Sequence, residues 1–504
     1  MSRTKESLKI IGSNILIQIV LVICGLILPP MIIKEYHSEV NGLVNTVRQV
    51  VYYLSFISLG LGVASQVALY KPLSTKDWES VNGILSATRI YFNRIGYIYI
   101  FLIILTALIF PLLIKSSLSF SVIFAIIFIY GIGSVAEFIF LNKYKILLVA
   151  DQKIYVVANI NAQGFILNTL FSAILILFHS SIIFVQLVAT LSYLFRLFFV
   201  IRYVKKKYPH VSFVESPKFE KIEDKNHAFF YQLSGMIISY TPIIIVSLFC
   251  GLKDASVFSV YNMVFFSLTM ITSIFTSGFA ATFGNIIAKN ETGILVKSFE
   301  EFEYIYRLVL FFCYSSAIVL VAPFMSIYIN NSDGVNYIIP ILGVAFGVSN
   351  IFRALRVPFT TIVEAAGKFK ENNLLNIIEA ILNVILAIFM AKWYGLIGVL
   401  IASAISGLLR TCLYVLDVNR LILKSFPVKY FAKYLLNLLL VFVIFHLFQN
   451  IYVKNYFEWG KSAMLVSFVI FFSLFLLNSL LDIRTTLNVY VRIRLMVSNY
   501  LIKK

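Results

Sequence analysis

Residues 205–226, KKKYPHVSFVESPKFEKIEDKN, form the longest polar stretch of a 504-residue chain that is otherwise mainly apolar. Six apolar runs long enough to cross a bilayer precede this stretch, and eight follow it. A membrane span needs about 20 mainly apolar residues to cover a hydrocarbon core of roughly 30 Å. The predicted spans are residues 10–33, 43–69, 84–114, 120–141, 154–177, 182–204, 228–249, 256–280, 304–329, 337–360, 374–392, 397–416, 431–450 and 464–482.

The composition agrees with this count of spans. Hydrophobic residues make up 60% of the chain, charged residues make up 13%, and the mean hydropathy is +0.91. These values exclude a water-soluble protein of this size and predict an all-α integral membrane protein with 14 transmembrane helices. The four cysteines are scattered, without the spacing or the histidine companions of a metal site, so no disulfide framework and no metal site are expected.

The positive charge is distributed unevenly about the predicted spans. The net charge is +19, and with the N-terminus in the cytoplasm all but seven of the 42 Lys and Arg lie on the cytoplasmic side or in cytoplasmic loops. This asymmetry predicts that both termini are cytoplasmic. The basic tract at 202–207 therefore suits anionic lipid, and no nucleic-acid partner is expected. The exceptions are Lys34, Lys115, Lys253, Lys392, Lys454 and Lys461 outside, and Arg48 within a span.

The two halves of the chain match at nearly one offset. An offset of 215 aligns Lys153 with Lys368, Asn161 with Asn376 and Asn168 with Asn383; 214 aligns Arg196 with Arg410, and 217 aligns Asn45 with Asn262. Six spans is an even number, so the two copies enter the membrane from the same side and are parallel repeats. We therefore expect an N-lobe at 1–204, a cytoplasmic linker at 205–227, a C-lobe at 228–416, and two added helices with a basic tail at 417–504.

Polar residues recur on one face of several predicted spans. In the second span, Asn41, Asn45, Arg48, Tyr52 and Ser55 follow spacings of four, three, four and three. The corresponding span of the second half carries Ser259, Asn262 and Thr269, and the first span carries Asn14 and Gln18. Such residues either form hydrogen bonds between packed helices or line an aqueous cavity. Similar stripes in two equivalent spans favour the cavity.

Charged residues inside the predicted spans point to an anionic substrate. A charge at the bilayer centre costs about 2.5–3.5 kcal/mol on insertion scales, so it normally faces the protein interior or water. Arg48 lies roughly 9 Å inside the predicted outer interface, and Arg353 and Arg356 lie near the cytoplasmic end of the tenth span. Guanidinium groups suit phosphate or pyrophosphate. The remaining intramembrane charges, expected to be paired charges or coupling sites, are Glu137, Glu379 and Arg196.

Short motifs beside the spans resemble those of a known transporter family. The motifs are EVNGLVN at 39–45, SLGLG at 58–62, LYKPL at 69–73, LLVADQK at 147–153, LRVP at 355–358 and EAAGKFK at 364–370. In order and spacing they resemble the Wzx-type oligosaccharide flippases of the multidrug/oligosaccharidyl-lipid/polysaccharide (MOP) superfamily. The resemblance covers essentially the whole chain. It implies a V-shaped pair of six-helix lobes, and the two terminal helices resemble the fourteen-span flippase pattern.

The resemblance also implies a function. It implies movement of undecaprenyl-pyrophosphate-linked oligosaccharides from the cytoplasmic to the outer leaflet of a bacterial plasma membrane, by alternating access through a central cationic cavity, for polymers such as O-antigen or capsule. Arg48 resembles, by its place in the span, a cavity arginine of the related lipid II flippases. We expect Arg48, Arg353 and Arg356 to contact the head group, with Asn14, Gln18, Asn45 and Asn262 lining the path.

No enzymatic chemistry and no cofactor are expected, and the membrane potential, H⁺ or Na⁺ are the candidates for coupling. The expected partners are the lipid-linked substrate, membrane lipids, a polysaccharide polymerase and glycosyltransferases. Two alternatives remain open. A drug or cation antiporter of the same fold would carry carboxylates in its cavity, and a membrane polymerase or ligase would carry a large external loop, whereas the longest external segments here have about a dozen residues.

Overall fold

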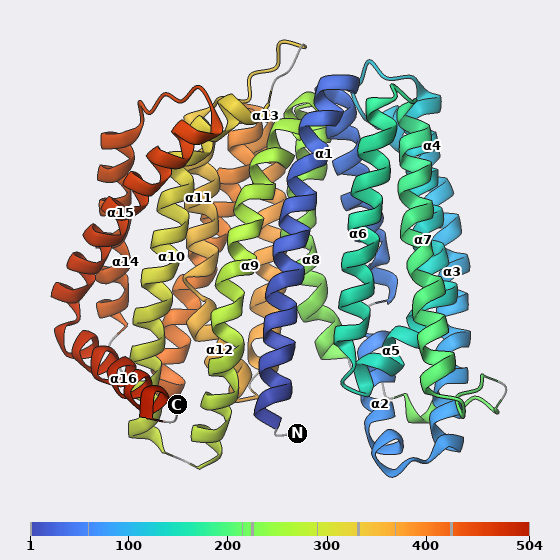
Figure 1. Cartoon of the computed structure of the whole chain (residues 1–504), viewed down its shortest axis with the longest axis horizontal. Coiled ribbons are helices and arrows are strands. Elements are labelled where there is room, and N and C mark those ends of the chain that lie inside the picture. The colour runs from blue at the N-terminus through green and yellow to red at the C-terminus, as the bar shows by residue number, and fades with distance from the viewer. Residues whose placement is uncertain are drawn as a thin grey trace. The chain divides into compact units, whose positions relative to one another are not determined.

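The computed structural model describes residues 3–58, 60–213, 215–222, 226–289, 291–329, 333–367, 369–423 and 427–502. Within these ranges the chain is helical and contains no β-strand (Figure 1). The long helices are α1 (Arg3–Leu54), α3 (Trp78–Leu113), α4 (Phe120–Ala136), α6 (Ile154–Leu177), α7 (Ile182–Lys207), α8 (Asn226–Phe249), α9 (Leu252–Ala288), α10 (Thr292–Tyr328), α13 (Phe369–Val418), α14 (Val428–Phe448), α15 (Tyr456–Leu481) and α16 (Ile483–Ile502). Shorter helices are α2 (Leu61–Thr75), α5 (Asn142–Ala150), α11 (Pro340–Ala354) and α12 (Val357–Ala365).

Twelve helical segments of the described residues are long and apolar enough to cross a membrane. The prediction of an all-α integral membrane protein is therefore confirmed. Two segments each cover a pair of predicted spans, because α1 and α13 continue through residues with non-helical backbone, His37 (φ 69°) and Gly395 (φ 57°). At about 1.5 Å per residue, helices of 52 and 50 residues are far longer than the hydrocarbon core is thick.

The second half of α13 folds back on the first half. Asn383 Nδ2 donates to Ser406 Oγ (2.9 Å), although the two residues are 23 positions apart. A Cβ atom on Gly398 would lie 2.0 Å from the carbonyl oxygen of Met390, so only glycine allows this close approach. The bend at Gly395 therefore separates two helical segments that pack against each other.

The bend in α1 is held by loops of the same compact unit. Tyr36 Oη donates to the Ser180 carbonyl, and Glu35 Oε1 lies 2.6 Å from His179 Nδ1. Glu39 accepts from the backbone N–H of Ser117 (2.7 Å). Directly after the bend at His37, the backbone N–H of Ser38 donates to an Asp333 carboxylate oxygen (2.6 Å). These contacts stabilise a positive φ that is strained for a residue with a side chain.

Some predicted spans end differently from the expectation. The helix expected at 43–69 ends at Leu54 and is followed by a short 3₁₀ turn at Ser55–Ser58, and a separate helix, α2, begins at Leu61 after Gly60 (φ 84°). Glycine permits this backbone conformation, and the hydropathy of the stretch does not reveal it. The span expected at 120–141 continues to Ala150 through a π-helical turn, η2 (Glu137–Leu141), and α5. The span expected at 337–360 is divided into α11 and α12.

The chain forms two compact units. The first contains residues 1–259 and 330–335, and the second contains residues 260–329 and 336–504. The first unit holds α1 to α8 and the beginning of α9, and the second holds the remainder. The lobe boundaries expected at 204, 227 and 416 stay predictions.

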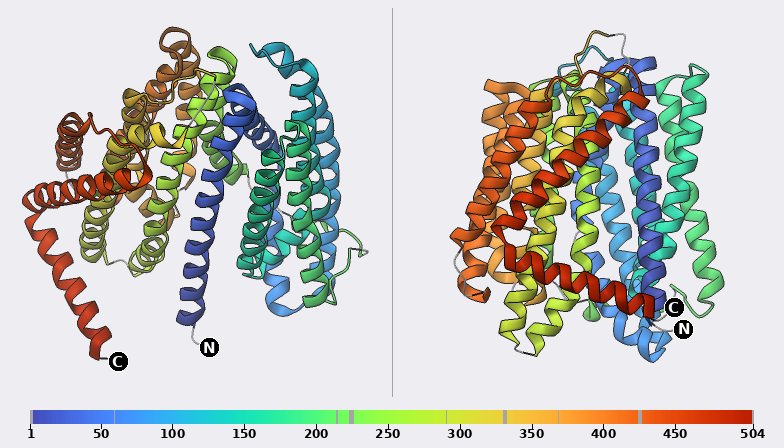
Figure 2. Two further views of the ribbon diagram at one scale, coloured as in Figure 1. Left: turned by 45° about the horizontal axis from the view of Figure 1, so that its top comes forward. Right: turned by 60° about the vertical axis from the view of Figure 1, so that its left-hand side comes forward.

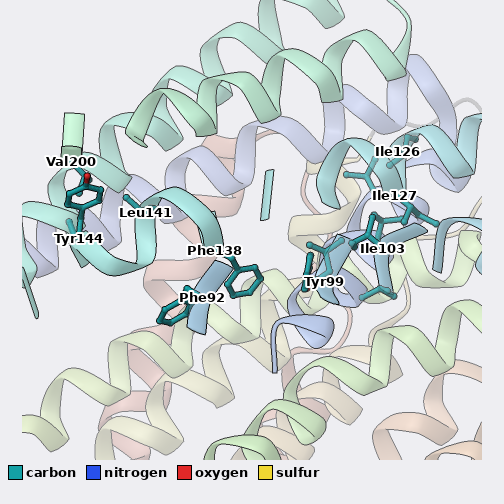
Figure 3. Close-up of a cluster of buried hydrophobic side chains, with 14 of the residues drawn as sticks. Phe92, Tyr99, Ile103, Ile126, Ile127, Phe138, Leu141, Tyr144 and Val200 are labelled. Carbon is teal, nitrogen blue, oxygen red and sulfur yellow. The ribbon is translucent and has the colours of Figure 1, made fainter. Parts of the chain in front are cut away.

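The interior of the first unit is closely packed around aromatic residues (Figure 3). Phe138 of η2 lies between Phe92 and Tyr99 of α3, with ring centroids 6.4 and 5.0 Å away. Tyr99 Oη donates to the Val51 carbonyl of α1 (2.7 Å). A Cβ atom on Gly131 of α4 would lie 2.3 Å from Ile103 Cγ2 of α3, so a glycine allows these two helices to approach closely. Packing of this kind, rather than exclusion from water, holds helices together in lipid.

The offset seen between the halves of the sequence recurs in the backbone. Helices α5 and α12 begin and end at residues 215 apart, and each is nine residues long. The left-handed residues that follow them, Gln152 (φ 58°) and Gly367 (φ 68°), are also 215 apart. Each unit thus contains the same helix and the same turn, which supports an internal duplication.

One buried side-chain contact is also repeated. In the first unit, Arg196 Nη1 donates to Asn161 Oδ1 (2.9 Å) and joins α7 to α6. In the second, Arg410 Nε donates to Asn376 Oδ1 (3.1 Å) and joins the two segments of α13. Both arginines are buried, at 3% and 2% exposed. A buried guanidinium requires such partners, so we interpret this contact as part of the scaffold.

Replacing Asn161 or Asn376 by Ala should therefore destabilise the protein. A hydrogen bond to a charged group contributes about 1.5–3 kcal/mol, so each variant should unfold at a temperature several degrees lower in detergent. Gln163→Ala, at an exposed position on α6 near Asn161, is the matched control. Unchanged melting of both asparagine variants would show that the repeated contact does not stabilise the fold.

Candidate functional site

A cavity of about 300 Å³ lies within the first unit. It is lined by α1 and the 3₁₀ turn after it, by α4, η2 and α5, and by α6 and α7. Its charged residues are Arg48, Glu137 and Lys145, and its other polar residues include Tyr52, Tyr130, Ser134 and Asn168. The surrounding helices are membrane-spanning segments. These polar groups therefore surround a cavity inside the helical bundle of the first unit.

Arg48 reaches this cavity from the second half of α1. It follows the predicted polar face, since Arg48, Tyr52 and Ser55 all line the cavity. The Arg48 side chain is exposed to this space, and its Nη2 lies 3.5 Å from Tyr130 Oη of α4. Tyr52 stacks on Tyr240 of α8, with ring centroids 6.0 Å apart. The guanidinium is thus held beside aromatic side chains and can still bind a ligand in the cavity.

The first half of the same polar face makes packing contacts. Asn45 Nδ2 donates to the Asn41 carbonyl (2.9 Å), and Asn41 Nδ2 donates to Ser256 Oγ (2.7 Å) at the beginning of α9. A Cβ atom on Gly42 would lie 1.8 Å from the Leu252 carbonyl oxygen, so the two helices touch through their backbones here. Asn41 therefore joins α1 to α9, and Asn45, which binds Asn41 within α1, does not line this cavity.

Glu137 and Lys145 face each other in the cavity, 3.6 Å apart between Oε1 and Nζ. Glu137 begins the π-helical turn η2, and Lys145 is in α5. π-Helical turns inside helices are frequent at functional sites. The two side chains are 26% and 43% exposed, so the ion pair is open to a ligand in the cavity. Glu137 was predicted as a paired charge, whereas Lys145 was not predicted at all.

Two of the charges predicted in the second unit, Arg356 and Glu379, form an ion pair. Arg356 Nη1 donates to both carboxylate oxygens of Glu379, each at 2.7 Å. Glu379 is almost completely buried, at 2% exposed, and Arg356 is 19% exposed. Arg353 is half-buried at the end of α11, beside Gly407 of α13. A ligand would have to compete with Glu379 for Arg356.

The remaining predicted residues are distributed over both units. Gln18 of α1 and Asn262 of α9 are half-buried. The side chain of Asn14 lies outside the described residues. Arg196 is not part of the cavity lining, and it borders a separate, mainly apolar hollow of about 280 Å³ between α6 and α7. Their roles in a transport path stay predictions.

The electrostatic balance of the cavity favours anions. Two cationic side chains and one carboxylate line it, together with hydroxyl and amide groups that can donate hydrogen bonds. Charges in such a site interact more strongly than in bulk water, because fewer water molecules screen them. No group of His, Cys, Asp and Glu that could hold a metal ion occurs among the described residues.

Comparison with known proteins identifies the fold. No protein-family model and no curated protein matches the sequence. Among solved structures, the lipid II flippase MurJ in an inward closed conformation matches with a TM-score of 0.66 at 16% identity, over 94% of this chain and 99% of that chain. The chain has the MOP fold.

Transporters of the same fold match over less of the chain. An inward-facing multidrug resistance MATE transporter of the MOP superfamily matches with a TM-score of 0.62 at 17% identity, over 80% of this chain and 94% of that chain. A MATE structure in a bent conformation gives 0.55 at 14% identity, over 82% and 94%. The matched structures named here are thus those of a flippase and of MATE transporters.

The cavity of this MOP-fold protein can be tested by cysteine accessibility. Ser55→Cys and Ser134→Cys, introduced after replacement of the four native cysteines, should react with a small water-soluble thiol reagent because both positions line the cavity. Thr46→Cys, at a fully buried position on α1, should not react under the same conditions. The cavity would be disproved if the two lining positions reacted no faster than position 46.

Proposed function

We propose that this protein is a flippase for a lipid-linked oligosaccharide carried on undecaprenyl pyrophosphate. In this proposal it moves the substrate from the cytoplasmic to the outer leaflet of a bacterial plasma membrane, for assembly of a surface polysaccharide. The observation that carries the proposal is the cationic cavity inside the membrane-spanning part of a MOP-fold unit. Arg48 and Lys145 supply its positive charge.

A pyrophosphate diester cannot cross hydrocarbon unaided, because burial of an unpaired ion costs tens of kcal/mol by ideal solvation estimates. Two cationic side chains in the cavity offset much of this cost through charge-assisted hydrogen bonds, which Arg can form with two oxygens at once. Tyr52, Tyr130 and Ser134 offer aromatic faces and hydroxyls to a sugar. The lipid tail stays in the bilayer while the head group passes through protein.

Glu137 has a defined role in this proposal. Its carboxylate lies 3.6 Å from the Lys145 ammonium, where a substrate phosphate would bind. The substrate therefore competes with Glu137 for Lys145, and protonation or cation binding at Glu137 would favour the substrate. The membrane potential, negative inside, adds about 2.3 kcal/mol per charge per 100 mV in favour of outward movement of the anion. Potential, H⁺ and Na⁺ are all compatible with this arrangement.

The extent of the structural match also supports a lipid-linked substrate. The match to MurJ covers 94% of the chain, whereas the matches to MATE transporters cover 80–84%. MurJ is named as a lipid II flippase, so the substrate in its name is a lipid. In the cell, glycosyltransferases would supply the substrate and a polysaccharide polymerase would use it.

Arg48→Gln and Lys145→Gln should each slow flipping of undecaprenyl-pyrophosphate-linked sugar in proteoliposomes at least tenfold, since each removes about one charge-assisted contact. In cells, Arg48→Ala should abolish export of the polymer while protein levels remain normal. Lys454→Gln, in an exposed loop, is the control and should have no effect. Undiminished flipping by the Arg48 and Lys145 variants would exclude the cavity as the head-group site.

A MATE-like exporter of cationic drugs is the second candidate, and the carboxylate of Glu137 in the cavity is the observation that favours it. The two functions predict opposite effects of Glu137→Gln. A cation exporter should lose substrate binding, because the only carboxylate among the described lining residues is gone. A flippase should bind its anionic head group severalfold more tightly, because Lys145 is released. Titration of the purified variant with undecaprenyl pyrophosphate and with a cationic dye distinguishes them.

A further inference from the structure

The last helix of the second unit is attached to its neighbours by a group of buried charges. Asp482, between α15 and α16, accepts from Arg307 Nη2 of α10 (2.5 Å) and from Lys433 Nζ of α14 (2.5 Å). Arg307 also pairs with Glu303 (3.4 Å), and both are buried, at 1% and 2% exposed. Because these charges require each other, the corner between α15 and α16 has a defined position.

Two further contacts hold α16 across α10. Thr486 Oγ1 donates to Tyr304 Oη (3.0 Å), and Arg492 Nη1 donates to a Glu301 carboxylate oxygen (2.5 Å). In the right-hand view of Figure 2, α16 crosses the neighbouring helices of its unit and does not run alongside them. This region was expected to be a basic tail, and the structure shows a helix up to Ile502.

The level at which α16 crosses α10 coincides with the predicted edge of the membrane. The contacts reach residues 301, 304 and 307 of α10, whose apolar span begins near residue 304. The apolar segment of α15 ends at Leu481, one residue before the corner. Two independent helices thus place α16 at the predicted boundary between lipid and water, on the side where the basic loops are predicted to lie.

The face of α16 that points away from α10 is apolar and exposed. Ile483, Leu487, Tyr490 and Val491 are 61%, 59%, 64% and 53% exposed, and their spacing of four, three and one places them on one side of the helix. Arg484 and Arg494 are exposed beside them, and α16 contains no acidic residue. Apolar side chains at this level fit lipid, and arginines beside them fit phosphate groups.

We propose that α16 is an interfacial helix that binds the surface of the bilayer through anionic phospholipids. Ile483, Leu487, Tyr490 and Val491 insert at the level of the head groups, and Arg484 and Arg494 contact lipid phosphates. The inference does not depend on the nature of the transported substrate, because it concerns residues outside the cavity. Its partner is a lipid surface, and neither a protein nor a second copy of this chain is required.

The proposal can be tested with spin labels on the full-length protein in phospholipid vesicles. Single cysteines at Leu487 and Tyr490, after replacement of the four native cysteines, carry the label, and Glu215→Cys, at an exposed position of the predicted cytoplasmic linker, is the solvent control. Collisions with oxygen, which concentrates in lipid, are compared with collisions with a water-soluble nickel chelate. We expect the oxygen-to-nickel ratio to be several-fold higher at 487 and 490 than at 215.

The lipid charge is tested by repeating the measurement in phosphatidylcholine vesicles with and without phosphatidylglycerol. The ratio at 487 should rise with phosphatidylglycerol, and Arg484→Gln with Arg494→Gln should remove this rise without lowering the melting temperature. High nickel access at both sites would show that the face lies in water and would overturn the proposal. Protection from both reagents would also overturn it, because another protein or a second copy would then cover the face.

Discussion

Backbone amide and carbonyl groups find no hydrogen-bonding partner in hydrocarbon, and this constraint governs the whole structure. A helix satisfies them within one segment, which is why the described chain is helical and why breaks occur where side chains or loops can compensate. At His37, loops bind Glu35, Tyr36 and Ser38 on both sides of the bend. The same constraint applies to side chains, since the buried Arg196 and Arg410 are each bound to an asparagine.

The fold class was predictable because hydropathy measures directly how long a segment can remain in lipid. The ends of segments were less predictable, because they depend on local backbone conformation. Gly60 interrupts the expected second span with φ 84°, and its neighbours are as apolar as those inside a span. By contrast, the turn at Gly395 lies in the break expected between the spans at 374–392 and 397–416, and the close approach of Gly398 to the Met390 backbone requires a glycine.

The candidate site was predictable in part. Arg48 was recognisable because a single charge deep in a span requires an unusual environment, and it lines the cavity as its helical face predicts. Asn41 and Asn45 lie on the same face, but Asn41 binds α9 and Asn45 binds back to Asn41 within α1, since periodicity alone does not tell which neighbour a face meets. Lys145 was missed because it lies near a charged loop in sequence, and the π-helical turn that changes its alignment with Glu137 has no sequence signal.

The repeated Arg–Asn contact has a consequence for the history of the molecule. A feature present in both halves was already present in the ancestral half, so that ancestor already joined two helices with a buried guanidinium. No basic residue corresponds to Arg48 or Lys145 at offsets of 214–217, where the second half has Asn262, Met263, Val264 and Phe265, and Phe359, Thr360, Thr361 and Ile362. The buried Arg–Asn contact is thus common to both halves, whereas the positions of Arg48 and Lys145 carry a positive charge in the first half and not in the second.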